Sequence, residues 1–160
     1  MKINPSIFKA YDIRGIVDRT LTIEGVTLIG KAIGSQVHNG KPVCVGRDGR
    51  LSGPAITKAL IAGIASTGVD VIDIGQTSSP GLYFATHALK TGNGVMVTGS
   101  HNPPEYNGLK IVLDGHAIYG AQIRTLLNRI NNKEFDIGDG CVTSENIGDR
   151  YIDRIQSDIQ

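Results

Sequence analysis

The strongest constraint on the fold is an alternation between short apolar runs and longer stretches with helical spacing. The apolar runs are bounded by glycine or proline, which is typical of buried strands, and they cover residues 42–46, 69–75, 94–98 and 109–113. The other stretches carry apolar residues every three or four positions, which is typical of amphipathic helices, and they cover residues 22–37, 56–64, 80–89 and 123–130. Thr20 or Thr22 is placed to cap the first of these helices. Strands that alternate with helices of this length predict βαβ units. We therefore predict an α/β fold with a mixed, mostly parallel sheet of about four strands sandwiched between helices.

The C-terminal part of the chain has a different pattern. Residues 134–148 are polar and rich in glycine, with little periodicity. Beyond them, Ile147, Tyr151, Ile155 and Ile159 recur every four residues and predict a last helix that runs to the final residue. We therefore divide the chain into a domain over residues 1–147 and a terminal helix over residues 148–160, which we expect to lead toward domains absent from this sequence.

Length and charge exclude several classes of function. A chain of 160 residues corresponds to about one domain, and its 16 Lys and Arg against 15 Asp and Glu leave a formal net charge of +1. Such a charge creates no bulk field that would attract nucleic acid or an acidic membrane surface. No segment resembles a secretion signal or a membrane span. The widely separated Cys44 and Cys141 predict inert thiols rather than a disulfide framework or a zinc site, which is typical of a reducing compartment. Together with the charge and the missing signals, this predicts a cytoplasmic protein without nucleic-acid or membrane partners.

The segment most able to carry chemistry covers residues 97–110, with the sequence Val-Thr-Gly-Ser-His-Asn-Pro-Pro-Glu-Tyr-Asn-Gly-Leu-Lys. It leaves the carboxyl end of a predicted strand, the edge at which open α/β sheets place their binding sites. On such a loop Ser100 could accept a covalent group, while His101 and Lys110 could transfer protons or supply positive charge. From composition alone, a polar turn is an equally good interpretation, because Ser, Asn, Gly and Pro are ordinary turn residues.

Taken as a whole, the segment closely resembles the active-site serine loop of the α-D-phosphohexomutase family. The resemblance begins with Thr-Gly-Ser-His-Asn-Pro at residues 98–103 and continues to Lys110. Two further segments agree in order and spacing: Phe-Lys-Ala-Tyr-Asp-Ile-Arg-Gly at residues 8–15 and Val-Gly-Arg-Asp-Gly-Arg-Leu-Ser-Gly-Pro at residues 45–54. The chain looks closest to the bacterial phosphomannomutase/phosphoglucomutase branch, because Gly99 precedes the serine and Pro-Glu-Tyr-Asn-Gly follows the loop motif.

This resemblance implies a reaction in which Ser100 carries a phosphoryl group. The group is given to a hexose monophosphate, and the resulting glucose or mannose 1,6-bisphosphate turns over and returns its other phosphate. By motif position, Lys110 would assist proton transfer or stabilise charge. His101 and Asn102 would order the loop and reach the phosphate or the substrate, and Tyr11 would line the reaction site.

A phosphoserine adds about −1.5 to −2 charges and therefore needs cations close by. Lys110 is the one formally cationic side chain of the loop segment itself. The family's use of further positive groups makes Arg14 the natural partner, with Arg47 and Arg50 as weaker candidates. For Arg50 the nearby Asp48 also suggests an ordinary surface ion pair.

The same resemblance implies Mg²⁺ and further domains. In the family, the serine phosphate binds Mg²⁺ together with aspartates of a DGDGDR-type loop, and other domains recognise the sugar and its phosphate. This sequence contains none of those motifs. The Ser100 phosphate would be the one metal ligand in this chain, whereas Mg²⁺ needs several oxygens. We therefore expect a nucleophile-bearing first domain that does not turn over substrate alone and works with C-terminal domains of the same protein.

Other interpretations compete with this one. The first is a serine hydrolase in which Ser100 pairs with His101; against it, neighbouring side chains on an extended loop point apart, and the Gly-x-Ser-x-Gly elbow is missing. The second is a non-catalytic phosphate-binding or assembly domain that uses the same loop. The remaining candidate side chains have ordinary structural interpretations, including the aspartate pair in a strand that could suggest a metal site: His38, His87, His116, Asp70 and Asp73.

Overall fold

Every strand and helix predicted above is present in the computed structural model, which describes residues 3–159. The helical elements are η1 (Pro5–Ile7), α1 (Ile23–Gly34), α2 (Gly53–Ala65), α3 (Ser79–Ala88), α4 (Ala121–Asn132) and α5 (Gly148–Asp158). The strands are β1 (Ile13–Ile16), β2 (Val43–Arg47), β3 (Val71–Gln76), β4 (Asn93–Val97), β5 (Tyr106–Leu113), β6 (His116–Ala117) and β7 (Val142–Ser144). Of the two candidate caps, Thr22 caps α1, and its hydroxyl accepts the Gly25 N–H at 3.1 Å.

The strands form one mixed sheet with the order β1-β5-β4-β2-β3-β7, and β6 pairs with the free end of β5. The pairs β2·β3, β2·β4 and β3·β7 are parallel, whereas β5 is antiparallel to β1, β4 and β6. Within residues 3–159, β5 is thus the one strand that runs against the others. The predicted α/β class with a mostly parallel sheet is confirmed.

The predicted count of about four strands is wrong, because the sheet has seven. The three additional strands lack the apolar pattern on which the prediction depended. Strand β1 has four residues at one edge, and β6 has two exposed residues. Strand β7 has three residues, all exposed, and pairs with β3 through the register of Val71 with Val142. Strands this short are fixed by their backbone partners rather than by burial of their own side chains.

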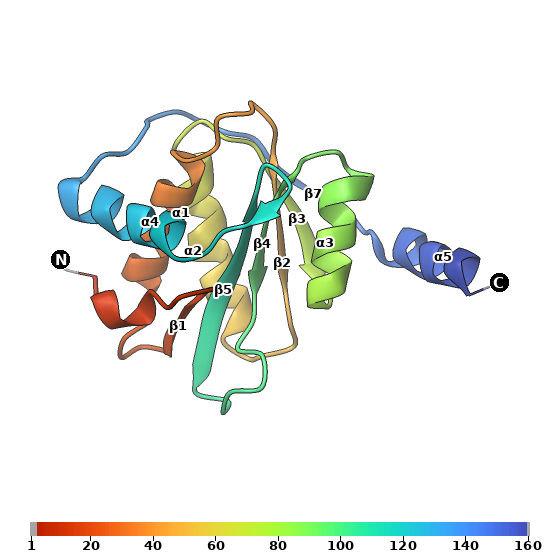
Figure 1. The fold of residues 1–160 in the computed structure, drawn as a ribbon, viewed down its shortest axis with the longest axis horizontal. Coiled ribbons are helices and arrows are strands. Elements are labelled where there is room, and N and C mark those ends of the chain that lie inside the picture. Colours follow the sequence, from red (N-terminus) through yellow and green to blue (C-terminus); the bar gives the residue numbers. More distant parts are fainter. Residues whose placement is uncertain (1–2, 160) are drawn as a thin grey trace.

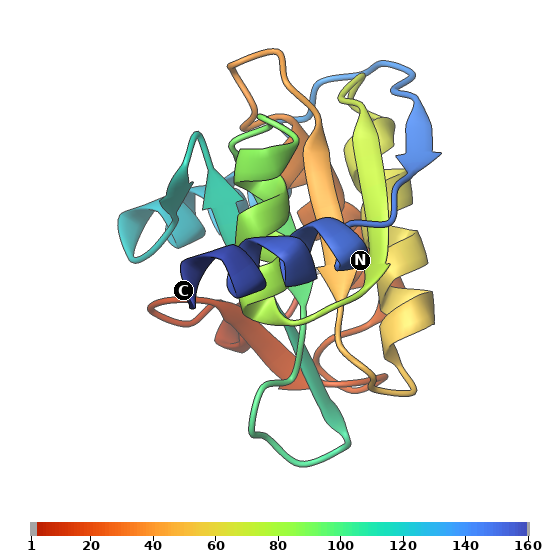
Figure 2. The same cartoon turned by 90° about the vertical axis from the view of Figure 1, so that its right-hand side faces the viewer.

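Helices cover both faces of the sheet. Helices α1, α2 and α4 lie on one face and α3 on the other (Figure 1, and the turned view of Figure 2). The larger apolar cluster lies under α1, α2 and α4, and the smaller one under α3 contains Cys44, Leu82 and Met96. Helices α1 and α2 approach so closely that a Cβ on Gly63 would lie 2.3 Å from the carbonyl oxygen of Thr27. This close approach explains why glycine occupies the contact.

The last helix, α5, extends away from the rest of the molecule (Figure 1). No residue of α5 is fully buried, and its closest tie is to α3, where the rings of Phe84 and Tyr151 lie 5.3 Å apart between centroids. Ile147, just before α5, is buried, whereas Ile155 and Ile159 are exposed. The helix ends at Asp158, so its predicted continuation is wrong at Ile159, which caps the helix, and Gln160 lies outside the described residues. No helix in the described part of the chain is long and apolar enough to cross a membrane.

Candidate active site

The predicted serine loop joins β4 to β5 at the carboxyl end of β4, at the lower edge of the sheet in Figure 1. Val97, the last residue of β4, is buried, and Ser100 is exposed three residues later. Ser100 has φ of 52°, in the left-handed region that residues other than glycine rarely adopt. Such a conformation costs about 1–3 kcal/mol and persists where surrounding contacts hold it. The contacts that hold this loop therefore define the site.

One arginine side chain fills the inside of the loop. The Arg50 guanidinium donates from Nη1 to the carbonyl oxygens of Pro103 at 2.7 Å and Tyr106 at 2.9 Å. From Nη2 it donates to the carbonyl oxygens of Ser100 at 2.8 Å and Asn102 at 2.6 Å. The side chain is 15% exposed, so these bonds are largely shielded from water. Arg50 therefore binds the backbone of the loop at four points.

A carboxylate connects this arginine to the serine. Asp48 Oδ2 lies 3.5 Å from Arg50 Nε and accepts a hydrogen bond from Thr98 Oγ1 at 2.8 Å. Thr98 Oγ1 in turn accepts the backbone N–H of Ser100 at 2.8 Å. The expected ion pair between Arg50 and Asp48 is present, but it is a small part of what Arg50 does. Sequence reasoning ranked Arg50 as a weak candidate because Asp48 is near, and it missed the four carbonyl partners, which lie fifty or more positions away along the chain.

Glycine and asparagine complete the loop. A Cβ on Gly99 would lie 2.2 Å from Arg50 Cζ, so the guanidinium occupies the space that a side chain would need. The Asn102 side chain donates to the Gly99 carbonyl oxygen at 2.9 Å, and the Asn102 backbone N–H donates to the same oxygen at 3.0 Å. This glycine is the sequence signal that could have revealed the close approach of Arg50.

The side chains of Ser100 and His101 lie together, with Ser100 Oγ 3.2 Å from His101 Nδ1. The expectation that these neighbours point apart is wrong, because the left-handed φ of Ser100 turns the chain at that point. Both residues are exposed. Within residues 3–159 no hydrogen bond joins the second ring nitrogen of His101 to a carboxylate, the contact that orients the base of a serine hydrolase.

Arg14 and Lys110 lie on the two paired strands β1 and β5. Arg14 stands opposite Gly108 in the register of β1 with β5, and Lys110 is two residues further along β5. Because side chains alternate across a sheet, both face the side that α3 covers. On the other side of Gly108, its carbonyl oxygen accepts the Thr98 N–H at 3.0 Å. The Cα atoms of Arg14 and Thr98 are thus separated by two strand spacings, about 10 Å.

The two cations differ in their existing partners. Arg14 Nη2 lies 2.5 Å from Asp12 Oδ2, while Arg14 Nε is buried and makes no hydrogen bond. The side chain of Lys110 is half-buried, and within residues 3–159 its ammonium makes neither a hydrogen bond nor an ion pair. The charge of Arg14 is therefore partly neutralised by its ion pair with Asp12, whereas the charge of Lys110 is not neutralised by a neighbouring carboxylate.

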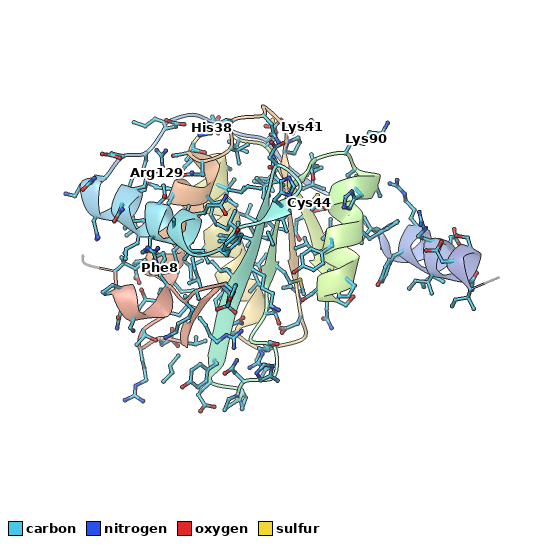
Figure 3. All side chains as sticks on the ribbon, in the orientation of Figure 1. Phe8, His38, Lys41, Cys44, Lys90 and Arg129 are labelled. Carbon is cyan, nitrogen blue, oxygen red and sulfur yellow. The ribbon has the colours of Figure 1, made fainter. Side chains whose placement is uncertain are left out.

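The other candidates make no hydrogen bond to the serine loop within residues 3–159. Tyr11 is 78% exposed in the turn before β1. Arg47 donates to Gln76 Oε1 at 3.5 Å rather than to the loop. His38 and Lys41 lie in the segment between α1 and the start of β2 (Figure 3), at the opposite end of the sheet from the loop that follows β4.

The remaining histidines and the aspartate pair are also distant from the loop. His87 is in the last turn of α3, and His116 pairs with Leu113 at the far end of β5. Asp70 accepts the Cys141 N–H at 2.8 Å and ties the segment before β7 to the start of β3, while Asp73 accepts the Gly75 N–H at 2.9 Å within a local turn. These two carboxylates bind protein groups and do not converge on a shared point.

The described residues do not fit a magnesium site. Asp48 is the carboxylate that binds the loop, and its oxygens already accept from the Thr98 hydroxyl and from the Arg50 backbone N–H at 3.1 Å. No group of three or more His, Cys, Asp or Glu residues able to hold a metal occurs among residues 3–159. Ser100 would contribute one ligand, whereas Mg²⁺ prefers six oxygens.

Comparison with known proteins identifies the family. Residues 5–136 match the family model described as phosphoglucomutase/phosphomannomutase, alpha/beta/alpha domain I. The chain therefore belongs to the phosphoglucomutase/phosphomannomutase family, of which it contains domain I. The predicted membership of the phosphohexomutases is confirmed.

Individual relatives agree with this assignment. A Pseudomonas aeruginosa protein named phosphomannomutase/phosphoglucomutase is 49% identical over 156 residues, which cover 96% of this chain and 34% of the relative. A Neisseria meningitidis phosphoglucomutase is 44% identical over 158 residues, again 96% of this chain and 34% of the relative. A crystal structure of a phosphoglucomutase/phosphomannomutase family protein from Burkholderia thailandensis superposes with a TM-score of 0.93 at 45% identity, covering 98% of this chain and 36% of that chain. The chain thus spans about a third of the length of the curated relatives it matches.

Proposed function

We propose that this chain is the phosphoserine-bearing domain of a phosphohexomutase that interconverts hexose 1-phosphate and hexose 6-phosphate, with mannose and glucose phosphates as substrates. The observation that carries the proposal is Ser100, an exposed hydroxyl in a left-handed conformation on a strand-end loop. The names of the relatives, phosphomannomutase/phosphoglucomutase and phosphoglucomutase, support the substrate class.

The proposed reaction has two balanced halves. In the first, the P–O bond to Ser100 Oγ breaks and a new P–O bond forms to a free hydroxyl of the hexose monophosphate, which gives a hexose 1,6-bisphosphate. The proton of the sugar hydroxyl passes to a base, and Ser100 Oγ gains a proton. The second half reverses these bonds with the other phosphate of the sugar, so Ser100 is phosphorylated again. Such a transfer depends on positioning and on charge neutralisation more than on covalent help from the protein.

The roles that we propose for the neighbouring residues follow from their partners. Lys110, with no ion pair in the described chain, supplies charge or moves the proton. Arg14 adds positive charge from β1, and His101 contacts Ser100 Oγ directly through Nδ1. Asn102 holds the loop through Gly99 and stands near the place where substrate would approach. Tyr11, highly exposed in the turn before β1, is proposed to contact the sugar.

The rest of the site is proposed to lie outside this chain. The matched relatives are about three times as long, which supports further domains that supply sugar specificity and most of the Mg²⁺ ligands. The phosphate on Ser100 would be this domain's ligand to the metal, and a hexose 1,6-bisphosphate would serve as activator. Both cysteines are free, one buried and one exposed, which supports a reducing compartment such as the cytoplasm.

The proposal can be tested with a chimera. Residues 1–160 replace the matching first third of the Pseudomonas aeruginosa relative, and the conversion of mannose 1-phosphate and of glucose 1-phosphate is measured with glucose 1,6-bisphosphate as activator. We expect turnover with both sugars and a phosphate mass on a peptide that contains Ser100. In the Ser100→Ala chimera the rate of turnover should fall by at least about 1000-fold and the phosphate mass on this peptide should be missing, since a covalent intermediate cannot form.

A matched control uses another exposed serine, Ser144→Ala on β7, which should keep full activity. A Ser100→Ala chimera as active as the parent would refute the proposal. A folded parent chimera that turns over neither sugar would favour a non-catalytic phosphate-binding domain instead.

A further inference from the structure

Arg50 uses four of its five donors on the backbone of the loop. A guanidinium carries five N–H groups in a fixed planar fork. Two on Nη1 and two on Nη2 are directed to the carbonyl oxygens of the four loop residues Ser100, Asn102, Pro103 and Tyr106. The fifth, on Nε, lies 3.5 Å from Asp48 Oδ2 in an ion pair. A guanidinium with both terminal nitrogens engaged in this way cannot grip a phosphoryl group with its fork without releasing the loop.

The hydrogen bonds from Arg50 fix the orientation of the loop's carbonyl groups as well as the position of the loop. Each carbonyl oxygen that accepts from Arg50 points into the loop, so four negative dipole ends are turned toward the guanidinium. A phosphate on Ser100 carries about −1.5 to −2 charges and would be repelled by exposed carbonyl oxygens. The guanidinium therefore removes unfavourable partners from the surroundings of the Ser100 hydroxyl.

The guanidinium is itself held in place from its other side. Asp48 contacts Arg50 Nε and also accepts from Thr98 Oγ1, which binds the Ser100 N–H. Gly99 leaves the space into which the guanidinium fits, since a Cβ there would lie 2.2 Å from Arg50 Cζ. The chain segments on both sides of Ser100 are thus connected to the one Arg50 side chain, which is 15% exposed.

We infer that Arg50 is the positioning residue of the nucleophile: it fixes the orientation of Ser100 through four backbone carbonyls and makes no contact with the transferred phosphoryl group. The inference rests on the proposed function for its catalytic readout, but the ordering of the loop can be measured without it. Lysine cannot replace Arg50, because an ammonium has three donors and cannot reach four separated carbonyl oxygens.

The catalytic test uses Arg50→Lys and Arg50→Ala in the chimera described above. A nucleophile displaced by about 1 Å loses about 100-fold in rate. We expect kcat to fall about 100-fold in both variants while KM for glucose 1-phosphate changes less than about threefold. Added guanidinium chloride at tens of millimolar should restore part of kcat in Arg50→Ala, and the same concentration of ammonium chloride should not. Arg124→Lys on the exposed surface of α4 is the matched control and should behave as the parent.

The structural test uses residues 1–160 alone and amide hydrogen exchange followed by mass spectrometry. In Arg50→Lys we expect peptides that cover residues 98–106 to exchange at least about tenfold faster, while peptides from α1 keep the exchange rate of the parent. Uniformly faster exchange would show global destabilisation and would overturn a specific positioning role. Because lysine keeps the charge and much of the volume, Arg50→Lys carries the test if Arg50→Ala does not fold.

The outcomes separate the inference from the function on which it rests. Full activity in Arg50→Lys, or a rise in KM with kcat retained, would overturn the positioning role, the second by showing that Arg50 binds substrate. A parent chimera without activity, together with faster loop exchange in Arg50→Lys, would refute the proposed function and leave the ordering of the loop by Arg50 standing.

Discussion

The hydroxyl of Thr98 is the link between the buried arginine system and the Ser100 backbone, so its removal is a sharp test of the site. Thr98 is 7% exposed, its Oγ1 donates to Asp48 Oδ2 at 2.8 Å, and the same oxygen accepts the Ser100 N–H at 2.8 Å. Thr98→Val keeps the shape of the side chain and removes both hydrogen bonds. Thr98→Ser keeps the hydroxyl and removes one methyl group.

The size of the effect follows from these two bonds. A hydrogen bond to a charged carboxylate contributes about 1.5–3 kcal/mol and a neutral one about 0.5–1.5 kcal/mol. The Asp48 side chain is 25% exposed, so water can replace part of the lost donor and the lower values apply. We therefore expect Thr98→Val to lose about 2–3 kcal/mol in the free energy of unfolding. Thr98→Ser should lose about 1 kcal/mol, the value of one buried methyl group.

Urea denaturation followed by far-ultraviolet circular dichroism measures these free energies, since the chain contains no tryptophan to report unfolding by fluorescence. In a chain of this size a loss of 1 kcal/mol lowers Tm by about 2–4 °C, so Thr98→Val should melt about 4–12 °C below the parent. In the chimera, Thr98→Val should also lower kcat more than Thr98→Ser does. If the valine variant were as stable as the serine variant, the link from Asp48 to Ser100 would contribute nothing to the fold and the reasoning would be refuted.

Three other predictions concern the thiols and the last helix. Burial raises the pKa of the Cys44 thiol above its ordinary value of 9.0, so the unfolded chain loses this proton at a lower pH than the folded chain. The free energy of unfolding from urea titrations should therefore fall as the pH rises past 9.0, and this part of the decline should be missing in Cys44→Ala. With a thiol reagent near neutral pH, exposed Cys141 should react first and Cys44 only on unfolding. Tyr151→Ala removes the ring that packs 5.3 Å from Phe84, so amide exchange in α5 should accelerate while the global free energy of unfolding changes by less than about 0.5 kcal/mol.

The buried elements of the fold could be predicted from the sequence, because burial imposes a hydrophobic pattern. Strands β2 and β4 are almost entirely buried, and their apolar runs placed them within one or two residues. Strand β7 is fully exposed and carries no such pattern, since its place is set by backbone hydrogen bonds to β3. The sequence of an exposed edge strand does not differ from that of a loop, which is why the predicted sheet was too small.

The candidate site was predictable to the same extent and for a related reason. Ser100, His101 and Lys110 are close in sequence and were found as a group. The role of Arg50 depends on hydrogen bonds to backbone carbonyls. Every residue has a backbone carbonyl, so no pattern of side chains in the sequence identifies which residues Arg50 binds. The contact between Ser100 and His101 depends on a left-handed φ at a non-glycine residue, which local sequence does not predict.

The positive charges around Ser100 are too few for the charge that a phosphoryl group would bring. Arg50 uses its donors on the loop and Asp48, and Arg14 is paired with Asp12 at 2.5 Å. Lys110 is the cation of the cluster that has no ion pair within residues 3–159. One such charge does not balance the −1.5 to −2 charges that a phosphoserine carries at neutral pH. A chain with a net charge of +1 offers no general positive field to make up the difference. If Ser100 is the phosphorylated residue, we therefore expect the remaining neutralisation to come from groups outside this chain, and the exposed Ser100 hydroxyl is accessible to such groups.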